Sequence, residues 1–279
     1  MQTTYRQAGR RKKRLRRRTS PAKQILKIVI IAAICVIAAY LTLVFALGFT
    51  ATTRSFPTDN GKSITISYVG FIKDGVATSG SVTTSRGERG TVSQNKIIYS
   101  DGALYEGELD GFVRHGKGKL TFANGDIYEG EFISDEINGH GKFIYYSTGD
   151  VYEGEISGGK KVGIGKYSYL DGTVYEGNYE NDLPNGQGKL TFFDGAVYEG
   201  NFTGGTRQGS GKYTFANGDI YEGEFKDGKM HGTGVYSFAC GDKYEGEFTD
   251  GNISGQGKYT WADGRDYTGK FDGGIAVID

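Results

Sequence analysis

The chain has 279 residues, of which 47 are Gly, 20 are Tyr and 16 are Phe, whereas only 3 are Pro and 2 are Cys. This composition is typical of many short strands joined by tight turns. The formal net charge of zero hides an asymmetry, because residues 1–27 carry 11 Lys or Arg and no acid. The other 252 residues therefore have a net charge of −11, which argues against binding to anionic phosphoinositide headgroups.

Residues 1–27 form a basic segment that we expect to be a cytoplasmic tail. Its runs RRKKR at residues 10–14 and RRR at 16–18 would on their own fit a nucleic-acid patch. The segment lies immediately before an apolar stretch, however, and Lys and Arg accumulate on the cytoplasmic side of a membrane span. Near the membrane they also attract anionic lipid. We therefore expect a membrane partner and no nucleic acid.

Residues 28–49 contain no charged side chain and predict a single transmembrane helix. As a helix these residues would extend about 33 Å, against a hydrocarbon core of about 30 Å. We expect a single-pass plasma-membrane protein whose N terminus is cytoplasmic and whose remaining chain is extracytoplasmic. A cleaved signal peptide is the alternative, since Ala46 and Gly48 are small, but the apolar stretch exceeds the usual 7–15 residues of such a signal.

Residues 50–100 predict a linker followed by degenerate repeats. The stretch 63–71 alternates like a strand, and the stretch from Tyr68 to Gly75 has the spacing of the later repeats without their glutamates. We expect these strands to cap the first edge of the sheet, because terminal repeats are usually atypical. A simple tether is the alternative.

From residue 101 to 279 the sequence is organised by a repeat. Eight tyrosines recur at steps of 23 or 24 residues, at positions 105, 128, 152, 175, 198, 221, 244 and 267. Each opens a run such as Tyr-Glu-Gly-Glu-Phe, whose apolar and charged residues alternate with the period of two of a half-buried strand. A glycine-rich turn, a second alternating strand and another turn complete the unit. Each period therefore predicts a β-hairpin, and the one 24-residue step predicts a bulge or longer turn within residues 143–148.

The alternation also predicts which residues share a face of the sheet. Tyr, Gly and Phe of the first strand point to one side together with the aromatic residues of the second strand. The glutamates point to the other side with a recurring lysine, such as Lys119 or Lys212. We expect the glycines to leave room for a neighbouring ring to lie over bare backbone.

This pattern resembles the MORN (membrane occupation and recognition nexus) repeat. The resemblance rests on the run YEGEF, then DG, then HGxG, an aromatic strand and N/D-G-D, and it covers residues 105 to 271 in seven units and a final half. It implies an all-β fold, an elongated single-layer antiparallel sheet of β-hairpin repeats with an aromatic-lined groove, here preceded by one transmembrane α-helix. It also implies a binding and assembly module that is not itself catalytic.

Catalytic and metal chemistry have weak support in the sequence. His115 and His231 occupy a turn position, and no His or Cys pair has metal-ligand spacing. The glutamates recur in every unit on the polar side, unlike a catalytic pair. Cys35 lies in the apolar segment, so Cys240 is expected to be a free thiol or an intermolecular bridge. We expect no enzyme activity, no metal and no cofactor.

The sequence therefore predicts a membrane-anchored scaffold or binding protein whose aromatic groove takes a protein partner or a second copy of the chain. Alternatively, the rings stack on cell-envelope glycan or cage a lipid headgroup. The candidate groove residues are Tyr128, Phe132, Tyr145, Tyr152, Tyr169, Tyr175, Tyr198, Tyr213, Phe215, Tyr221, Phe225, Tyr236, Tyr244, Phe248, Tyr259 and Trp261.

Overall fold

The computed structural model describes residues 21–57 and 62–277, without the side chains of residues 21–25, 27 and 28. Most of the predicted cytoplasmic tail, residues 1–20, lies outside the described residues. The chain forms two compact units, Met1–Phe49 and Thr50–Asp279.

The helix α1 (Pro21–Ala46) has 26 residues and contains the apolar stretch Val29–Ala46. All its large apolar side chains from Val29 to Phe45 except Val44 are exposed, which suits lipid better than water. The predicted helix is confirmed, but its predicted end at residue 49 is wrong. Gly48 adopts a φ of 91° and its N–H donates to the Phe45 carbonyl at 3.0 Å, which closes the helix. Among the described residues α1 is the candidate membrane anchor.

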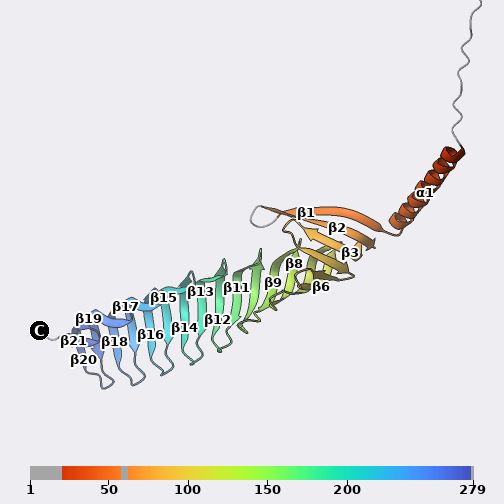
Figure 1. Ribbon diagram of the computed structural model, residues 1–279. Coiled ribbons are helices and arrows are strands. Elements are labelled where there is room, and N and C mark those ends of the chain that lie inside the picture. Colours follow the sequence, from red (N-terminus) through yellow and green to blue (C-terminus); the bar gives the residue numbers. More distant parts are fainter. Residues whose placement is uncertain (1–20, 58–61, 278–279) are drawn as a thin grey trace, which may run out of the picture. The chain divides into compact units, whose positions relative to one another are not determined.

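The second unit is one open antiparallel sheet of 21 strands, shown in Figure 1. Each strand pairs with its neighbour in sequence, so the sheet is a continuous meander. The strands are β1 (Phe49–Pro57), β2 (Ser63–Lys73), β3 (Val76–Thr84), β4 (Arg89–Ser93), β5 (Lys96–Tyr99), β6 (Leu104–Asp110), β7 (Val113–Thr121), β8 (Ile127–Ile133), β9 (Glu136–Ile144), β10 (Val151–Ser157), β11 (Lys160–Ser168), β12 (Val174–Glu180), β13 (Leu183–Thr191), β14 (Val197–Thr203), β15 (Thr206–Thr214), β16 (Ile220–Lys226), β17 (Lys229–Ser237), β18 (Lys243–Thr249), β19 (Asn252–Thr260), β20 (Asp266–Asp272) and β21 (Ile275–Val277).

The core of the sheet is a row of rings that we call the spine. It consists of the tyrosine and the aromatic or aliphatic residue that begin and end each Tyr-x-Gly-x-Phe run. Tyr198 packs edge-on against Phe202 of its own strand at 5.2 Å and against Phe225 of the next hairpin at 4.9 Å. The same pair of contacts recurs along the sheet, so each hairpin packs against the next through rings that bury one another.

Glycine makes the spine possible, as the sequence predicted. Gly200 and Gly211 lie opposite each other on adjacent strands beneath the Tyr198 ring. A Cβ added to Gly200 would lie 2.6 Å from the Gly211 Cα and 2.8 Å from the Ser210 carbonyl oxygen. A side chain there would collide with backbone, which has no freedom to move aside.

The register between the two strands of a hairpin shifts after the glycine of the first strand, and two side chains bond at this irregularity. In β8 the register shifts between Gly130 and Phe132. The Tyr128 hydroxyl donates to the Glu131 carbonyl at 3.0 Å, so the bulged carbonyl is satisfied inside the spine. In β10 the carboxylate of the equivalent Glu155 accepts the Ile164 N–H at 3.1 Å. The second glutamate of the repeat therefore has a structural role.

The opposite side of the sheet, which we call the polar face, carries the first glutamate of each repeat. In four repeats its carboxylate pairs with the lysine of the preceding hairpin, as the sequence predicted. These pairs are Lys119–Glu129 at 2.7 Å, Lys166–Glu176 at 2.9 Å, Lys189–Glu199 at 2.9 Å and Lys212–Glu222 at 2.6 Å. All are about half exposed, so each adds little stability compared with the spine.

The turns between hairpins are linked to one another by aspartates. Asp219 accepts the Ala239 N–H of the next turn at 2.8 Å and the Tyr236 hydroxyl at 2.8 Å. Asp150 and Asp242 make the same two bonds to their own successors. The 24-residue step lies in such a turn: Gly149 donates to the Tyr145 carbonyl four residues back, whereas the other turns span three. The predicted longer turn is confirmed.

The β2–β3 hairpin repeats the geometry of the later units. Gly70 lies opposite Gly80, and the Tyr68 hydroxyl donates to the carbonyls of Phe71 and Ser79 at 2.8 and 2.9 Å. Tyr68 stacks on Phe112 at the first hairpin of the repeat region, with ring centroids 5.1 Å apart. The strand predicted at 63–71 is confirmed, and this hairpin packs against the start of the repeats.

Candidate binding groove on the aromatic face

A second row of rings lies beside the spine on the same side of the sheet, which we call the aromatic face. These rings come from the second strand of each hairpin and the turn after it, and they are only partly buried. We call this row the aromatic ladder. Its members are Phe122, Phe143, Tyr145, Tyr167, Tyr169, Phe192, Tyr213, Phe215, Tyr236, Phe238, Tyr259 and Trp261.

The ladder rings contact one another in a zigzag. From Phe192 to Trp261 successive centroids lie 4.5 to 5.8 Å apart. A first run from Phe122 to Tyr169 has spacings of 4.5 to 6.3 Å. Leu190 stands where a ring would join the two runs. The aromatic face therefore offers a strip of ring edges and faces that crosses all seven hairpins.

The sixteen predicted groove residues divide between these two rows. Nine of them belong to the spine and are at most 4% exposed: Tyr128, Phe132, Tyr152, Tyr175, Tyr198, Tyr221, Phe225, Tyr244 and Phe248. The prediction is corrected for these nine, because neighbouring hairpins bury them and leave no surface for a ligand. The other seven are in the ladder: Tyr145, Tyr169, Tyr213, Phe215, Tyr236, Tyr259 and Trp261.

Sequence reasoning also missed part of the ladder. Phe122, Phe143, Tyr167, Phe192 and Phe238 occupy the same repeat positions as the seven predicted members. The 23-residue period was sufficient to find them. It was not sufficient to tell the two rows apart, because both rows point to the same side of the sheet and only packing between hairpins buries one of them.

Basic side chains lie among the ladder rings at alternate hairpins. Arg207 is half buried and lies over the rings of Phe192 and Tyr213 at 5.9 and 5.3 Å. Lys161 lies over Tyr145 and Tyr167 at 5.5 and 5.2 Å. Burial lowers the pKa of Lys161, while the electron-rich ring faces favour its cation. These residues give the groove floor local positive charge.

Shallow hollows line the groove near its C-terminal end. One of about 200 Å³ lies among Arg207, Tyr213, Phe215, Lys229 and Met230. The next, of about 260 Å³, shares Phe215 and Met230 with it. Each hollow is bounded by ladder rings on one side and by the glycine-rich hairpin turns on the other, so the ladder is the wall of a groove.

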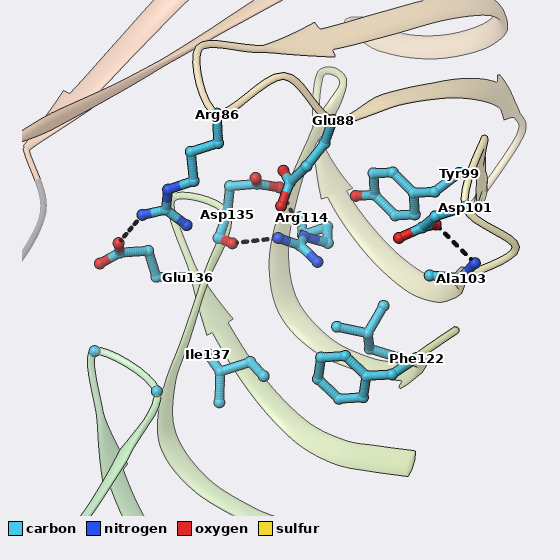
Figure 2. Close-up of a pocket in the computed structure, with 13 residues that line it drawn as sticks. Arg86, Glu88, Tyr99, Asp101, Ala103, Arg114, Phe122, Asp135, Glu136 and Ile137 are labelled. Carbon is cyan, nitrogen blue, oxygen red and sulfur yellow. Dashed lines mark hydrogen bonds and ion pairs between the residues drawn. The ribbon is translucent and has the colours of Figure 1, made fainter. Parts of the chain in front are cut away.

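A larger and differently charged hollow of about 320 Å³ lies at the N-terminal end of the same groove. Phe122 of the ladder and Ile137 form one side of it, and Figure 2 shows four acidic and two basic side chains around it. The acidic ones are Glu88, Asp101, Asp135 and Glu136, and the basic ones are Arg86 and Arg114. We call this hollow the acidic pocket.

Arg114 and Asp135 form a buried pair in the wall of the acidic pocket. Arg114 Nε donates to Asp135 Oδ1 at 2.7 Å, and Nη2 donates to the Asp135 carbonyl at 2.7 Å. The Asp135 N–H donates back to the Arg114 carbonyl at 3.0 Å. Burial alone would lower the pKa of Arg114, but Asp135, Tyr99 and Glu88 raise it above its ordinary value. The guanidinium is therefore a fixed cation.

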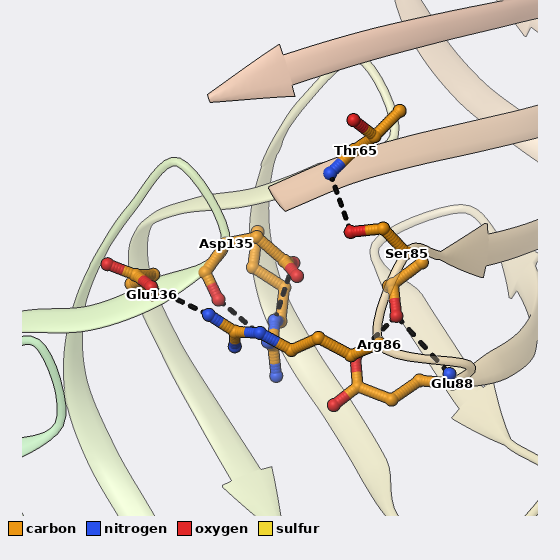
Figure 3. A network of polar contacts seen from close by, with 8 residues as sticks. Thr65, Ser85, Arg86, Glu88, Asp135 and Glu136 are labelled. Atoms are coloured by element: carbon orange, nitrogen blue, oxygen red, sulfur yellow. Dashed lines mark hydrogen bonds and ion pairs between the residues drawn. The ribbon is translucent and has the colours of Figure 1, made fainter. Parts of the chain in front are cut away.

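Figure 3 shows how the rest of the acidic pocket is assembled. Arg86, in the loop after β3, donates to Glu136, the first residue of β9, at 2.9 Å. Glu88 accepts the Thr84 hydroxyl at 3.0 Å. The pocket thus joins the degenerate N-terminal hairpins to the first true repeats, and the sequence alone did not predict it.

Other chemistry has little support in the described part of the chain. Within residues 21–57 and 62–277, no group of three or more His, Cys, Asp or Glu side chains is arranged to hold a metal. Cys35 and Cys240 are both free and exposed. A broad hollow on the polar face is lined by Glu199, Lys212 and Glu222, whose charges are already paired across strands.

Comparison with known proteins agrees with this geometry. No curated protein matches the chain. The model of the MORN repeat matches seven segments: 105–127, 128–149, 152–174, 175–197, 198–220, 221–243 and 244–264. Together these segments cover more than half of the 279 residues, and each begins at a spine tyrosine. The chain belongs to the MORN repeat family.

Proposed function

We propose that this protein is a membrane-anchored, non-enzymatic scaffold that holds an extended protein segment in the groove beside the aromatic ladder. MORN repeats suggest a binding or scaffold role, and α1 is a candidate anchor. The observation that carries the proposal is the ladder itself: a strip of partly exposed rings, in contact with one another, that nothing else in the described chain covers.

An extended protein segment suits the dimensions of this groove. Hairpins repeat about every 9.6 Å along the sheet, which is two strand spacings. An extended chain advances about 3.3 Å per residue, so three residues of an occupant would span one hairpin. Because its side chains alternate between two sides, every sixth residue would present the same side to an equivalent hollow. Partly buried rings with polar edges are also the residues that dominate protein interfaces.

Site-specific photocross-linking tests the groove. We would place p-benzoylphenylalanine at Phe215 or Phe238 in the ladder and at Ile164, which is exposed on the polar face. We expect both ladder positions to cross-link the same protein in membranes and Ile164 to cross-link none of it. A product of twice the 30.3 kDa chain mass would identify a second copy as the occupant. Equal labelling from both faces, or none from the ladder, would contradict the proposal.

The membrane arrangement needs its own test. We propose that the N terminus is cytoplasmic and the repeats are extracytoplasmic, because the basic excess lies before α1. A reporter fused after Asp279 that is active only outside the cytosol should be active, and the chain should remain in the membrane fraction after carbonate washing. A reporter active only in the cytosol would reverse the topology, and a soluble product would indicate cleavage after the apolar segment.

A further inference from the structure

The acidic pocket contains a buried carboxylate oxygen that lacks a partner. Asp135 has a side chain only 3% exposed. Its Oδ1 accepts from Arg114, but its Oδ2 is buried and accepts no hydrogen bond. A buried acceptor without a donor costs free energy, so the Asp135 Oδ2 atom requires an explanation, and a further bound group is one that would satisfy it.

The charges around Asp135 favour a cation as that group. The four acidic and two basic side chains that line the pocket give it a formal net charge of −2. Both basic groups are already paired, Arg86 with Glu136 and Arg114 with Asp135. The Glu88 carboxylate accepts the Thr84 hydroxyl and acts on Arg114 only through its charge, which helps to raise the pKa of that guanidinium. Asp101 accepts only the Ala103 N–H. An anion would meet this surplus of carboxylates at close range and be repelled.

The position of the pocket relates it to the groove. Its walls include Phe122 and Ile137, which occupy the same repeat positions as Phe238 and Ile253 near the other end. An occupant lying along the ladder would therefore reach the pocket without leaving the groove. At the other end, the hollow lined by Arg207 and Lys229 has two basic residues and no acid in its lining.

We propose that the acidic pocket is a subsite for a cationic side chain, lysine or arginine, of the segment that occupies the groove. This inference rests on the proposed function and adds the direction in which the occupant lies along the groove. The positive group lies at Glu88, Asp101 and Asp135, and an acidic group of the occupant faces Arg207 and Lys229. From β7 to β15 there are eight strand spacings, about 38 Å, so in an extended occupant the two charges are about 12 residues apart.

Methyl NMR of the full chain in detergent micelles tests this with two small probes. Ala103 and Ile137 line the acidic pocket, and Met230 lines the basic hollow. The chain has only one methionine besides Met1, so its methyl signal is readily assigned. We expect n-propylguanidinium to shift the methyl signals of Ala103 and Ile137 saturably, with a Kd on the order of millimolar. The methyl signal of Met230 should not change. Propionate should do the reverse.

Two variants separate a binding site from general charge attraction. Glu88→Gln keeps an oxygen that can accept the Thr84 hydroxyl and removes one negative charge, and we expect it to weaken propylguanidinium binding at least fivefold. Glu199→Gln, on the polar face, is the matched control and should change nothing. Asp135→Asn is unsuitable, because it removes the charge of the buried pair with Arg114 and would destabilise the fold.

The outcomes distinguish this inference from the proposed function. If propylguanidinium gives no saturable shift at Ala103 and Ile137, or if Glu88→Gln binds it as tightly as the native chain, the cation subsite is wrong. If propionate does not shift the Met230 methyl signal, the proposed direction of the occupant is wrong. Either result leaves the cross-linking from Phe215 and Phe238 unaffected. Conversely, saturable guanidinium binding without ladder cross-links would leave a cation-binding pocket but remove the groove's protein occupant, and the assignment of the pocket to a side chain of that occupant would be wrong.

Discussion

The spine and the aromatic ladder are built from the same residue types on the same face of one sheet, yet their surroundings differ. A spine ring such as Tyr221 touches rings of its own and the next hairpin and is fully buried. A ladder ring such as Phe238 touches the ladder rings on either side of it and keeps part of its surface free. The difference teaches that packing between hairpins buries one row of aromatic residues completely and leaves the other row partly exposed.

Alkaline pH should break the spine as a whole. Burial raises the pKa of Tyr128, Tyr175 and Tyr198 to about 12, against about 10 in an unfolded chain. A tyrosine whose folded pKa is raised contributes stability that is fully present below pH 10 and is lost as pH rises from 10 through 12. Because several such tyrosines titrate together, we expect cooperative unfolding in that range, measured by circular dichroism and by tyrosinate absorbance.

The two signals should move together. If tyrosinate absorbance reaches its full value well before the β-sheet signal is lost, the spine tyrosines ionise inside the folded sheet, and the comparison with the ladder fails.

A matched pair of truncations should separate the two rows at single positions. Phe225→Ala opens a cavity between Tyr198 and Tyr221, and we expect it to cost about 3–5 kcal/mol of the free energy of unfolding. Phe238→Ala removes a ring that is already partly exposed, so we expect less than half of that cost. Urea unfolding of the full chain in detergent measures both. Similar costs for the two variants would show that the ladder is as structural as the spine.

Substitution of a spine glycine should show whether the packing of the spine depends on the bare backbone beneath its rings. Gly200→Ala places a methyl group against the Gly211 Cα and the Ser210 carbonyl, and we expect a loss of about 1–3 kcal/mol from overpacking. Thr203→Ala, exposed at the end of the same strand, is the control and should cost little. If Gly200→Ala is tolerated equally well, the close approach of Tyr198 to the paired glycines is not what fixes the strands.

Much of the fold was predictable because its rules are local. Alternation assigned the faces, paired glycines marked where Tyr198 and its equivalents lie, and one extra residue placed the longer turn before Asp150. The helix end was missed by three residues because Gly48 ends the helix through its backbone conformation, while the apolar composition continues to Phe49.

The candidate site was only half predictable because it depends on contacts between units. Nothing in the sequence of one repeat shows that Phe225 is covered by the tyrosine of the hairpin before it, or that Phe238 is not. The acidic pocket was missed entirely, since Arg86 and Glu88 belong to the degenerate segment and line one pocket with Asp135 only when that segment packs against the first repeats.

The smallest effect that we expect concerns how the ladder is held in place. Asp219 fixes Tyr236 of the ladder through the tyrosine hydroxyl and fixes the next turn through the Ala239 N–H. These bonds hold the pKa of Asp219 below its ordinary value, the Ala239 N–H most of all. A carboxyl whose folded pKa is lowered contributes stability that is present above its unfolded pKa of about 3.9 and is lost as pH falls through the folded value. Asp219→Ala should therefore cost on the order of 1 kcal/mol at pH 7 and progressively less below pH 4.

The matched control for Asp219→Ala is Asp194→Ala, because Asp194 accepts only the N–H of Ala196 within its own turn and Ala196 stands where other turns carry the linking aspartate. Urea unfolding at pH 7 and pH 3 gives the four values needed. Since Asp219 reaches the next hairpin and Asp194 does not, only Asp219→Ala should also release Tyr236, seen as faster ring flipping by NMR. The idea would be contradicted if both variants lost the same free energy of unfolding, or if the loss for Asp219→Ala did not become smaller at low pH. The bond between turns would then contribute no more than a bond within one turn, and ring packing alone would position the ladder.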